Sequence, residues 1–484
     1  MLTERSESSK NTTHPLINKI LFGHQPTPEL LAILLVYAVQ GILGISRLAV
    51  SFFLKDELAL SPAEVAAMMG IAALPWTIKP LFGFMSDGLP IFGYRRRPYL
   101  ILSGLVGVAA WVSLATVVHT AAAATFAIVI TSLSVAVSDV IVDSLIVERA
   151  RDESLVDSGS IQSLCWGAAA VGGLLTAYSS GLLLEQFSTR TVFAITAVFP
   201  LLVSAAAFLI SEEPVNSADE EGQAVVKDQI QQLWQALKQK AIWMPTLFLF
   251  LWQCTPTAES AFFYFSTNEL GFTPEFLGRV RLVTSLASLV GVWLFQRFLK
   301  TIPFRTIFLW TTLFSAGLGL TALLLVTHTN RSLGIDDHWF ALGDSLILTI
   351  MGQLTFMPVL ILAARLCPPG IEATLFAMLM SVLNLAGLVS KEGGAILTHL
   401  LGVTDTNFDQ LWLLVLITNV GSVLPLVFIK LLPNEDPQLT ARTASLIPPA
   451  SAIDHPQTGI VGNQSFIPNM SPELLEVKSD NYSN

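Results

Sequence analysis

Twelve stretches that are long and apolar enough to cross a lipid bilayer dominate this sequence of 484 residues. A membrane-spanning helix needs about 20 mostly apolar residues. Such stretches lie at roughly 29–53, 62–84, 98–119, 121–147, 160–184, 190–211, 242–266, 274–297, 303–326, 339–364, 373–400 and 408–431. Only 13% of the residues are charged, against about 25% in soluble domains. The sequence therefore predicts an all-α integral membrane protein with twelve transmembrane helices.

Positive charges predict how the chain is oriented. Eighteen of the 26 Lys and Arg residues lie in the termini and the even-numbered loops, and three lie in the odd-numbered loops. Because cytoplasmic loops carry an excess of Lys and Arg, both termini are predicted to be cytoplasmic. The first 28 residues are polar, so no cleavable signal peptide is expected, and the plasma membrane is the predicted location. The net charge of −10 argues against a nucleic-acid partner.

The longest polar break divides the spans six and six, as in transporters built from two related halves. Its second part carries apolar residues at helical spacing (Val226, Ile230, Leu233 and Leu237). The predicted parts are a cytoplasmic N-terminal tail (1–28), a six-helix bundle (29–211), a cytoplasmic linker with an amphipathic helix (212–241), a second six-helix bundle (242–431) and a disordered cytoplasmic tail (432–484).

Polar and charged residues inside the predicted spans are the candidate substrate-binding residues. An ionisable group at mid-span costs about 2.5–3.5 kcal/mol on insertion scales and usually has a function. The candidates are Gln40, Arg47, Lys79, Asp139, Asp143, Glu259, Arg281, Asn384 and Lys391. The alternative for each is that opposite charges neutralise one another and hold the helices in register. Glu259 follows Pro256, which interrupts helical hydrogen bonding.

Asp139 and Asp143 are the strongest candidates. They are four residues apart and share one face of a helix. Two carboxylates on one face repel when both are ionised, so one of them takes up a proton more readily. This pair is therefore predicted to perform proton coupling; structural neutralisation is the less favoured alternative.

The loop between the second and third spans carries a second pattern. Gly83 and Asp87 are followed by Gly93 and by the basic run Arg95, Arg96 and Arg97. This arrangement resembles the signature of the major facilitator superfamily, with about three extra residues between Asp87 and Gly93. An acid near a helix end can engage basic partners in one conformation and release them in another, so the loop is a predicted conformational gate. The alternative is that the arginines only anchor the loop at the membrane surface.

Three segments resemble one branch of that superfamily, the folate–biopterin transporter family. They are residues 75–99, residues 138–143 with 148–150, and residues 364–374 leading to Ser381 and Asn384. The resemblance covers nearly all of residues 29–431 and is greatest to cyanobacterial and plastid members. It adds Arg149 and Glu372 to the predicted gate.

The resemblance implies a secondary transporter that imports folates or related pterins by alternating access, coupled to protons. A pterin ring offers adjacent N–H donors that the carboxylate of Asp139 or Asp143 can accept. The two carboxylates of a folate favour cations, for which Lys79, Arg281 and Lys391 are the candidates. The expected partners are this substrate, protons and the bilayer. The chain is expected to be monomeric and to need no cofactor or metal.

Three alternatives remain at this stage. One is a major facilitator carrier for another polar solute, such as a sugar, a nucleoside or a drug. A membrane-bound enzyme is disfavoured because the seven histidines are scattered, without the helical pairs that metal sites use. A channel or receptor would show conductance without saturable flux.

Overall fold

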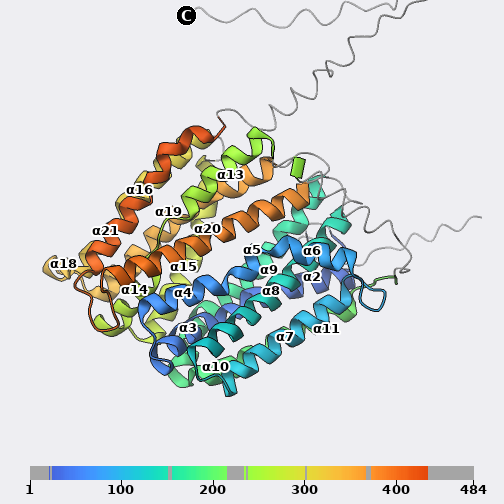
Figure 1. The fold of residues 1–484 in the computed structure, drawn as a ribbon, viewed down its shortest axis with the longest axis horizontal. Helices are drawn as coiled ribbons and strands as arrows, with labels where there is room; N and C mark the ends of the chain where they lie inside the picture. The colour runs from blue at the N-terminus through green and yellow to red at the C-terminus, as the bar shows by residue number, and fades with distance from the viewer. Residues whose placement is uncertain are drawn as a thin grey trace, which may run out of the picture. The chain divides into compact units, whose positions relative to one another are not determined.

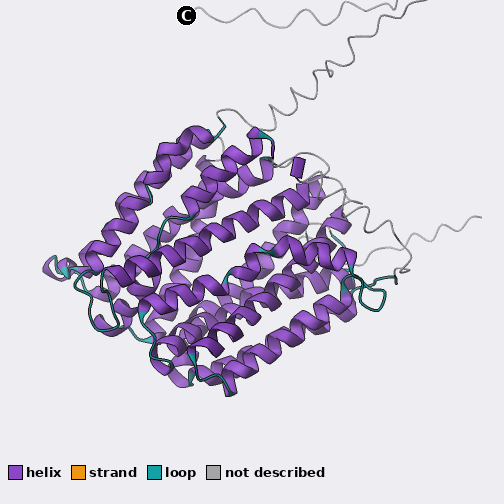
Figure 2. Ribbon diagram, in the orientation of Figure 1, coloured by secondary structure: helices purple, strands orange, loops and turns teal. Residues whose placement is uncertain are grey.

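The computed structural model describes residues 24–150, 155–214, 238–299, 302–366 and 372–433, together with residues 21, 234 and 235. Within these ranges the chain is helical and forms no strand (Figure 2). The predicted linker helix lies almost wholly outside the described residues, and the predicted tail lies outside them beyond residue 433.

The N-terminal half comprises six spans, several of them divided into shorter helices. In chain order its elements are α2 (Pro28–Ile42), η1 (Leu43–Ile45), α3 (Ser46–Phe52), η2 (Phe53–Glu57), α4 (Pro62–Ala72), α5 (Leu74–Thr77), α6 (Lys79–Gly88), α7 (Arg97–Thr116), α8 (Ala121–Ala150), α9 (Leu155–Gln186), α10 (Thr189–Thr196), α11 (Val198–Ala206) and η3 (Ala207–Leu209).

The C-terminal half follows the same plan. Its elements are α13 (Lys240–Gln253), α14 (Glu259–Tyr264), η4 (Phe265–Glu269), α15 (Pro274–Leu294), η5 (Phe295–Leu299), α16 (Phe304–Gly319), α17 (Ala322–Val326), α18 (Thr329–Ser332), α19 (Asp337–Arg365), α20 (Glu372–Leu400), α21 (Leu411–Gly421) and η6 (Leu424–Leu431).

Eleven of the described helical stretches are long and apolar enough to cross a membrane. They correspond to eleven of the twelve predicted spans. The remaining one, at 242–266, is interrupted: α13 ends at Gln253 and α14 begins at Glu259, with Pro256 between them. The all-α, twelve-helix prediction is therefore confirmed, and the seventh span is the one divided into two short helices by a non-helical segment.

The break in the seventh span is accommodated by α20. Proline lacks an N–H, so carbonyl groups of the preceding turn lose their helical partners, and inside a membrane they need others. The Ser390 hydroxyl donates a hydrogen bond of 2.5 Å to the Thr255 carbonyl. Gly394 has no side chain, and a Cβ there would overlap the Thr257 carbonyl. The glycine pair 393–394 thus allows α20 to approach the exposed backbone closely.

The helices start where the sequence supplies caps. The Thr27 hydroxyl accepts a hydrogen bond from the Leu30 amide at the start of α2, and Ser61 forms a reciprocal capping box with Glu64 at the start of α4. We call the end of the bundle where α2 begins the Pro28 end, and the end where α4 begins the Pro62 end. Successive spans run antiparallel between these two ends (Figure 1).

The two halves are joined at the Pro62 end. Lys55 donates a hydrogen bond of 2.9 Å to the Asn268 side-chain oxygen, and the rings of Phe52 and Phe263 meet edge to face with centroids 5.3 Å apart. Tyr264 is fully buried in an apolar cluster of the N-terminal half and donates to the Leu60 carbonyl. The structure is therefore closed at the Pro62 end.

Two glycines set how closely the halves approach there. A Cβ on Gly181 of α9 would lie 2.8 Å from the Cα of Gly278 on α15. The same Cβ would also overlap the Pro274 carbonyl of α15. Because both groups belong to the backbone of α15, neither can rotate away.

We expect Gly181→Val to separate α9 from α15 and to lower the unfolding temperature of the detergent-solubilised protein by several degrees. Gly343→Ala is the control, because nothing lies within 4 Å of a Cβ at that position; equal unfolding temperatures for both variants would contradict this packing.

Candidate substrate and proton site

A lysine lies between two carboxylates inside the N-terminal half. Lys79, the first residue of α6, forms an ion pair with Asp139 of α8, and its Nζ atom is 3.6 Å from the Asp143 Oδ2 atom. The two acids share one face of α8, as predicted from their spacing. The structure thus brings three of the predicted residues into one cluster, although they come from segments about 60 residues apart.

The position of Lys79 depends on a break in the second span. Helix α5 ends at Thr77 and Ile78 has φ −105° and ψ 15°, outside the helical region. Pro80 in the first turn of α6 accounts for the break, because it has no N–H to donate to the Trp76 carbonyl four residues earlier and its ring crowds that carbonyl. The Lys79 ammonium also lies 5.3 Å from the centre of the Trp76 ring, where a cation–π attraction favours it.

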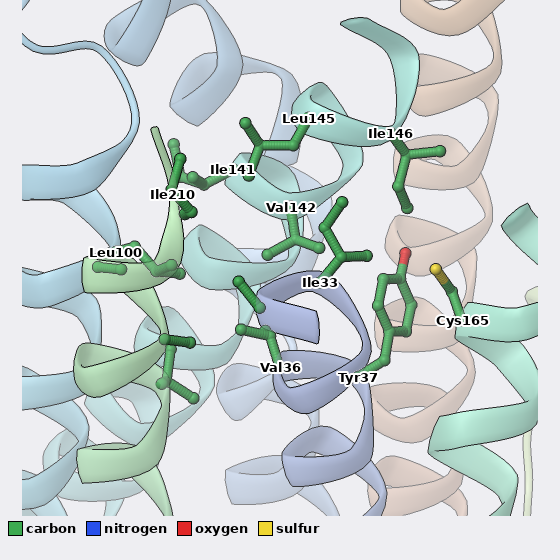
Figure 3. Packing of buried hydrophobic residues seen from close by; sticks show 14 of the residues in the cluster. Ile33, Val36, Tyr37, Leu100, Ile141, Val142, Leu145, Ile146, Cys165 and Ile210 are labelled. Atoms are coloured by element: carbon green, nitrogen blue, oxygen red, sulfur yellow. The ribbon is translucent and has the colours of Figure 1, made fainter. Parts of the chain in front are cut away.

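Helix α2 completes this cluster with two polar side chains. Gln40 donates a hydrogen bond of 3.0 Å to Asp139, and the Tyr37 hydroxyl donates one of 2.5 Å to Asp143. Gln40 was predicted from the sequence, whereas Tyr37 was not. The signal for Tyr37 is its place three residues before Gln40, on the same helical face. Its ring is packed in an apolar cluster with Ile33, Val36 and Cys165 (Figure 3).

The cluster carries one negative charge more than it can balance. With both acids ionised, Lys79 compensates only one carboxylate. The side chains of Asp139 and Lys79 are 11% and 14% exposed, while that of Asp143 is 44% exposed. Asp143 is therefore the accessible acid, and it can accept a proton or hydrogen bonds from the N–H groups of a ligand.

A second polar group lies between the halves. Arg281 of α15 donates hydrogen bonds of 3.0 Å to the Gly44 carbonyl and 3.3 Å to the Ser180 hydroxyl. Arg47 is exposed on α3 and follows Gly44 by three residues. Both arginines were predicted site residues, and Gly44, which contacts Arg281, lies about one helical turn from Arg47.

The other predicted binding residues are more scattered. Asn384 of α20 donates a hydrogen bond of 3.1 Å to the Trp76 carbonyl, so it contacts the segment that holds Lys79. Glu259 is exposed at the start of α14, and Lys391 is half-buried. Within the part of the chain that the structure describes, no hydrogen bond or ion pair joins these two residues to the Lys79 cluster, and no group of acids, histidines and cysteines is arranged to hold a metal ion.

The predicted gate is organised around Arg96. Its side chain is buried and donates to the Asp87 carboxylate at 2.8 Å and to the Ser86 hydroxyl at 2.7 Å. Gly93 has φ +82°, a conformation that glycine adopts without strain, and it allows the tight turn from Ile91 to Tyr94. The remaining predicted gate residues are Gly83, Arg95 and Arg97, and Gly83 faces Val140 of α8. The side chains of Arg149 and Glu372 lie outside the described residues.

Glu212 is a further residue of the gate that was not predicted. Its carboxylate accepts hydrogen bonds from the backbone amides of Arg95, Arg96 and Arg97, at 2.6, 2.9 and 3.0 Å. These amides precede and begin α7, where unpaired N–H groups and the helix dipole favour an anion. The sequence places Glu212 at the other end of the N-terminal half, so only the three-dimensional structure shows the contact.

We expect Glu212→Ala to destabilise the protein by about 1–2 kcal/mol, because it removes a charged cap from α7. The measurement is the unfolding midpoint in detergent. Glu213→Ala is the matched control, since Glu213 is exposed and neighbours Glu212. A larger loss in the control than in Glu212→Ala would contradict the role of this carboxylate.

The ion pair between Lys79 and Asp139 is expected to couple the effects of two substitutions on the stability of the protein. Lys79→Met leaves the buried Asp139 carboxylate without its cation, and breaking a buried pair costs about 3–5 kcal/mol. Adding Asp139→Asn removes that buried carboxylate charge and leaves only Asp143, whose side chain is 44% exposed, so we expect the double variant to recover part of the loss. Unfolding midpoints of the two single variants and the double variant measure this coupling; purely additive losses would contradict it.

Solved structures with the same fold have been determined for transporters. The chain matches the nucleoside transporter NupG with a TM-score of 0.61 at 15% identity, covering 83% of this chain and 98% of that one. It matches a D-xylose-proton symporter equally well, with a TM-score of 0.61 and 15% identity over 84% of this chain and 98% of that one. At this identity the likeness shows the fold alone. The chain is a multi-pass membrane protein with the major facilitator fold.

Sequence comparisons are more specific. The profile of the BT1 family matches residues 40–445. The chain is 61% identical over 469 residues to the folate-biopterin transporter of Synechocystis sp., covering 95% of this chain and 94% of that protein. It is 29% identical over 435 residues to folate transporter 2 of Plasmodium falciparum, covering 90% and 94% of the two chains. The protein belongs to the BT1 family of folate–biopterin transporters, as its sequence motifs predict, and this is a family of transporters rather than enzymes.

Proposed function

We propose that this protein imports folates or related pterins across the plasma membrane by alternating access, with uptake coupled to protons. The observation that carries the proposal is the 61% identity to the Synechocystis folate-biopterin transporter over nearly the full length of both chains. The fold supports it, since carriers of this class bind their substrates between two halves. The protein works as a monomer with its two six-helix bundles at 29–211 and 242–431.

The distribution of Lys and Arg supports an orientation with both termini in the cytoplasm. The Pro28 end then faces the cytoplasm and the Pro62 end faces outward. Because the described structure is closed at the Pro62 end, it corresponds to a state in which the outer route is shut. The contacts of Lys55 with Asn268 and of Tyr264 with Leu60 must open before a substrate enters from outside.

Asp143 is the proposed proton carrier. It is the more exposed of the two acids and carries the uncompensated charge of the Lys79 cluster. When Asp143 binds a proton, the cluster becomes neutral and its cost inside the membrane falls. The protonated carboxyl can still bind a pterin ring, because its O–H donates to a ring nitrogen while its other oxygen accepts an N–H of the neighbouring amino group. Proton and substrate can thereby bind Asp143 together, which import driven by an inward proton gradient requires.

Asp139 has a different proposed role. It is buried and held by both Lys79 and Gln40, so it fixes the lysine in place beside Asp143. Lys79 is engaged by the two acids, which makes it a weaker partner for the anionic end of a folate than the sequence alone implies. The gate formed by Asp87, Arg96 and Glu212 controls the cytoplasmic side in this proposal.

The test is uptake of radiolabelled folate by proteoliposomes, with and without an inward proton gradient. We expect saturable uptake that pterins compete for and that the gradient increases. Asp143→Asn should lose the response to the gradient, because an amide cannot carry the proton. Asp344→Asn is the control: this acid also lies within a span, on α19, and accepts a hydrogen bond of 2.5 Å from the Thr321 hydroxyl.

Three other results of the uptake experiment would each contradict a different part of the proposal. A normal gradient response in Asp143→Asn would remove that residue from proton coupling. Uptake that is indifferent to the gradient would leave the substrate assignment and exclude proton coupling. Absence of folate and pterin uptake by folded wild-type protein would overturn the substrate class and favour a carrier for another polar solute.

A further inference from the structure

Two arginines near the middle of the bundle have no acidic partner. Among the residues that the structure describes, neither Arg47 nor Arg281 forms an ion pair with a carboxylate, although both lie within predicted spans. The partners of Arg281 are a carbonyl and a hydroxyl, which leave its charge uncompensated. Arg47, three residues after Gly44, adds a second positive charge on the first span. Two uncompensated cations inside a membrane are costly unless an anion joins them.

Arg281 is half-buried and lies against Gly44 of the first span. Gly44 presents no side chain toward it: a Cβ there would lie 3.6 Å from an Arg281 guanidinium nitrogen and 3.5 Å from the Thr176 hydroxyl. Arg47 is one turn further along the same helix face and is exposed. Arg281 comes from the C-terminal half and Arg47 from the N-terminal half, so an anion held by both would bridge the halves.

The two arginines are aligned with the Lys79 cluster. Gln40, Gly44 and Arg47 lie on one face of the first span; Gln40 contacts Asp139, and Gly44 contacts Arg281. Seven residues of helix separate Gln40 from Arg47, which corresponds to about 10 Å. One face of the first span therefore connects an excess of negative charge to an excess of positive charge.

We propose that Arg47 and Arg281 form the subsite for the carboxylates of a pteroylglutamate, while the Lys79 cluster receives its pterin ring. This inference rests on the proposed function and extends it to specificity. A folate has an aminobenzoyl spacer between its ring and its glutamate, so its two ends can occupy the two groups together. A pterin without carboxylates occupies only the Lys79 cluster. Guanidinium groups favour carboxylates because they donate two parallel hydrogen bonds.

Substitution of either arginine should affect the uptake of folate and of biopterin differently. Arg281→Gln and Arg47→Gln should each raise the KM for folate by about 10- to 100-fold, the range expected for losing one charge-assisted hydrogen-bonded contact. The KM for biopterin, which has no carboxylate, should change less than about 2-fold. Arg281→Lys keeps the charge without the second donor and should retain part of the folate uptake.

Arg279→Gln is the matched control. Arg279 is on the same helix, is exposed and pairs with Glu275 of its own helix at 2.6 Å; its loss should leave both KM values unchanged. A second readout does not require transport. p-Aminobenzoylglutamate, which has the carboxylates but no pterin ring, should raise the unfolding temperature of wild-type protein and of Arg279→Gln, but not that of Arg281→Gln.

The outcomes distinguish the inference from the proposed function. Selective loss of folate recognition in the two arginine variants supports the subsite. Equal loss for folate and biopterin would show that the arginines serve packing or the conformational change, and it would overturn the subsite while leaving the proposed function intact. Unchanged kinetics in both variants would also overturn it. If the wild-type protein carries neither substrate, the proposed function fails and the subsite fails with it.

Discussion

The contact of Lys79 with Asp139 and Asp143 is the interaction on which the site depends. Inside a membrane an isolated charge is expensive, so three charges persist there only if they are held together. This requirement fixes the distance between α6 and α8, and Gln40 and Tyr37 then tie α2 to the same point. Three spans of the N-terminal half are thus held by polar contacts as well as by packing, which matters because apolar side chains gain little from leaving lipid.

Broken helices position these polar groups. The second span is interrupted at Ile78, directly before Lys79, and the seventh between Gln253 and Glu259. A continuous helix would satisfy its own backbone and offer a ligand nothing but side chains. Where it breaks, backbone carbonyls become available, and α20 supplies Ser390 to one of them and Asn384 to the carbonyl of Trp76. Helix α20 therefore contacts both interrupted spans, one in each half, and links their positions.

The sequence was sufficient for the fold and for several of the charged residues that the structure brings together around Lys79. Span positions follow from apolar length, and the pairing of Asp139 with Asp143 follows from helical spacing, because both properties are local. The contacts of Tyr37 with Asp143 and of Glu212 with the amides of α7 join residues more than 100 positions apart, and no local pattern contains that information. The division of the cations could not be predicted either: Lys79, Arg281 and Lys391 look equivalent as charges in spans, and only their partners differ.

That difference in partners gives the site its polarity. Lys79 is shared by two acids, whereas Arg281 donates to a carbonyl and a hydroxyl, and Arg47 forms no ion pair among the residues that the structure describes. The negative group lies within the N-terminal half, while the positive pair is divided between the halves. Under the proposed assignment, a ligand that neutralises only the first group would act within one half, and a ligand that also carries an anion would pull the two halves toward each other. Since a ligand shifts a conformational equilibrium only through its differential affinity for the two states, the anionic end is the part of a folate suited to drive closure around it.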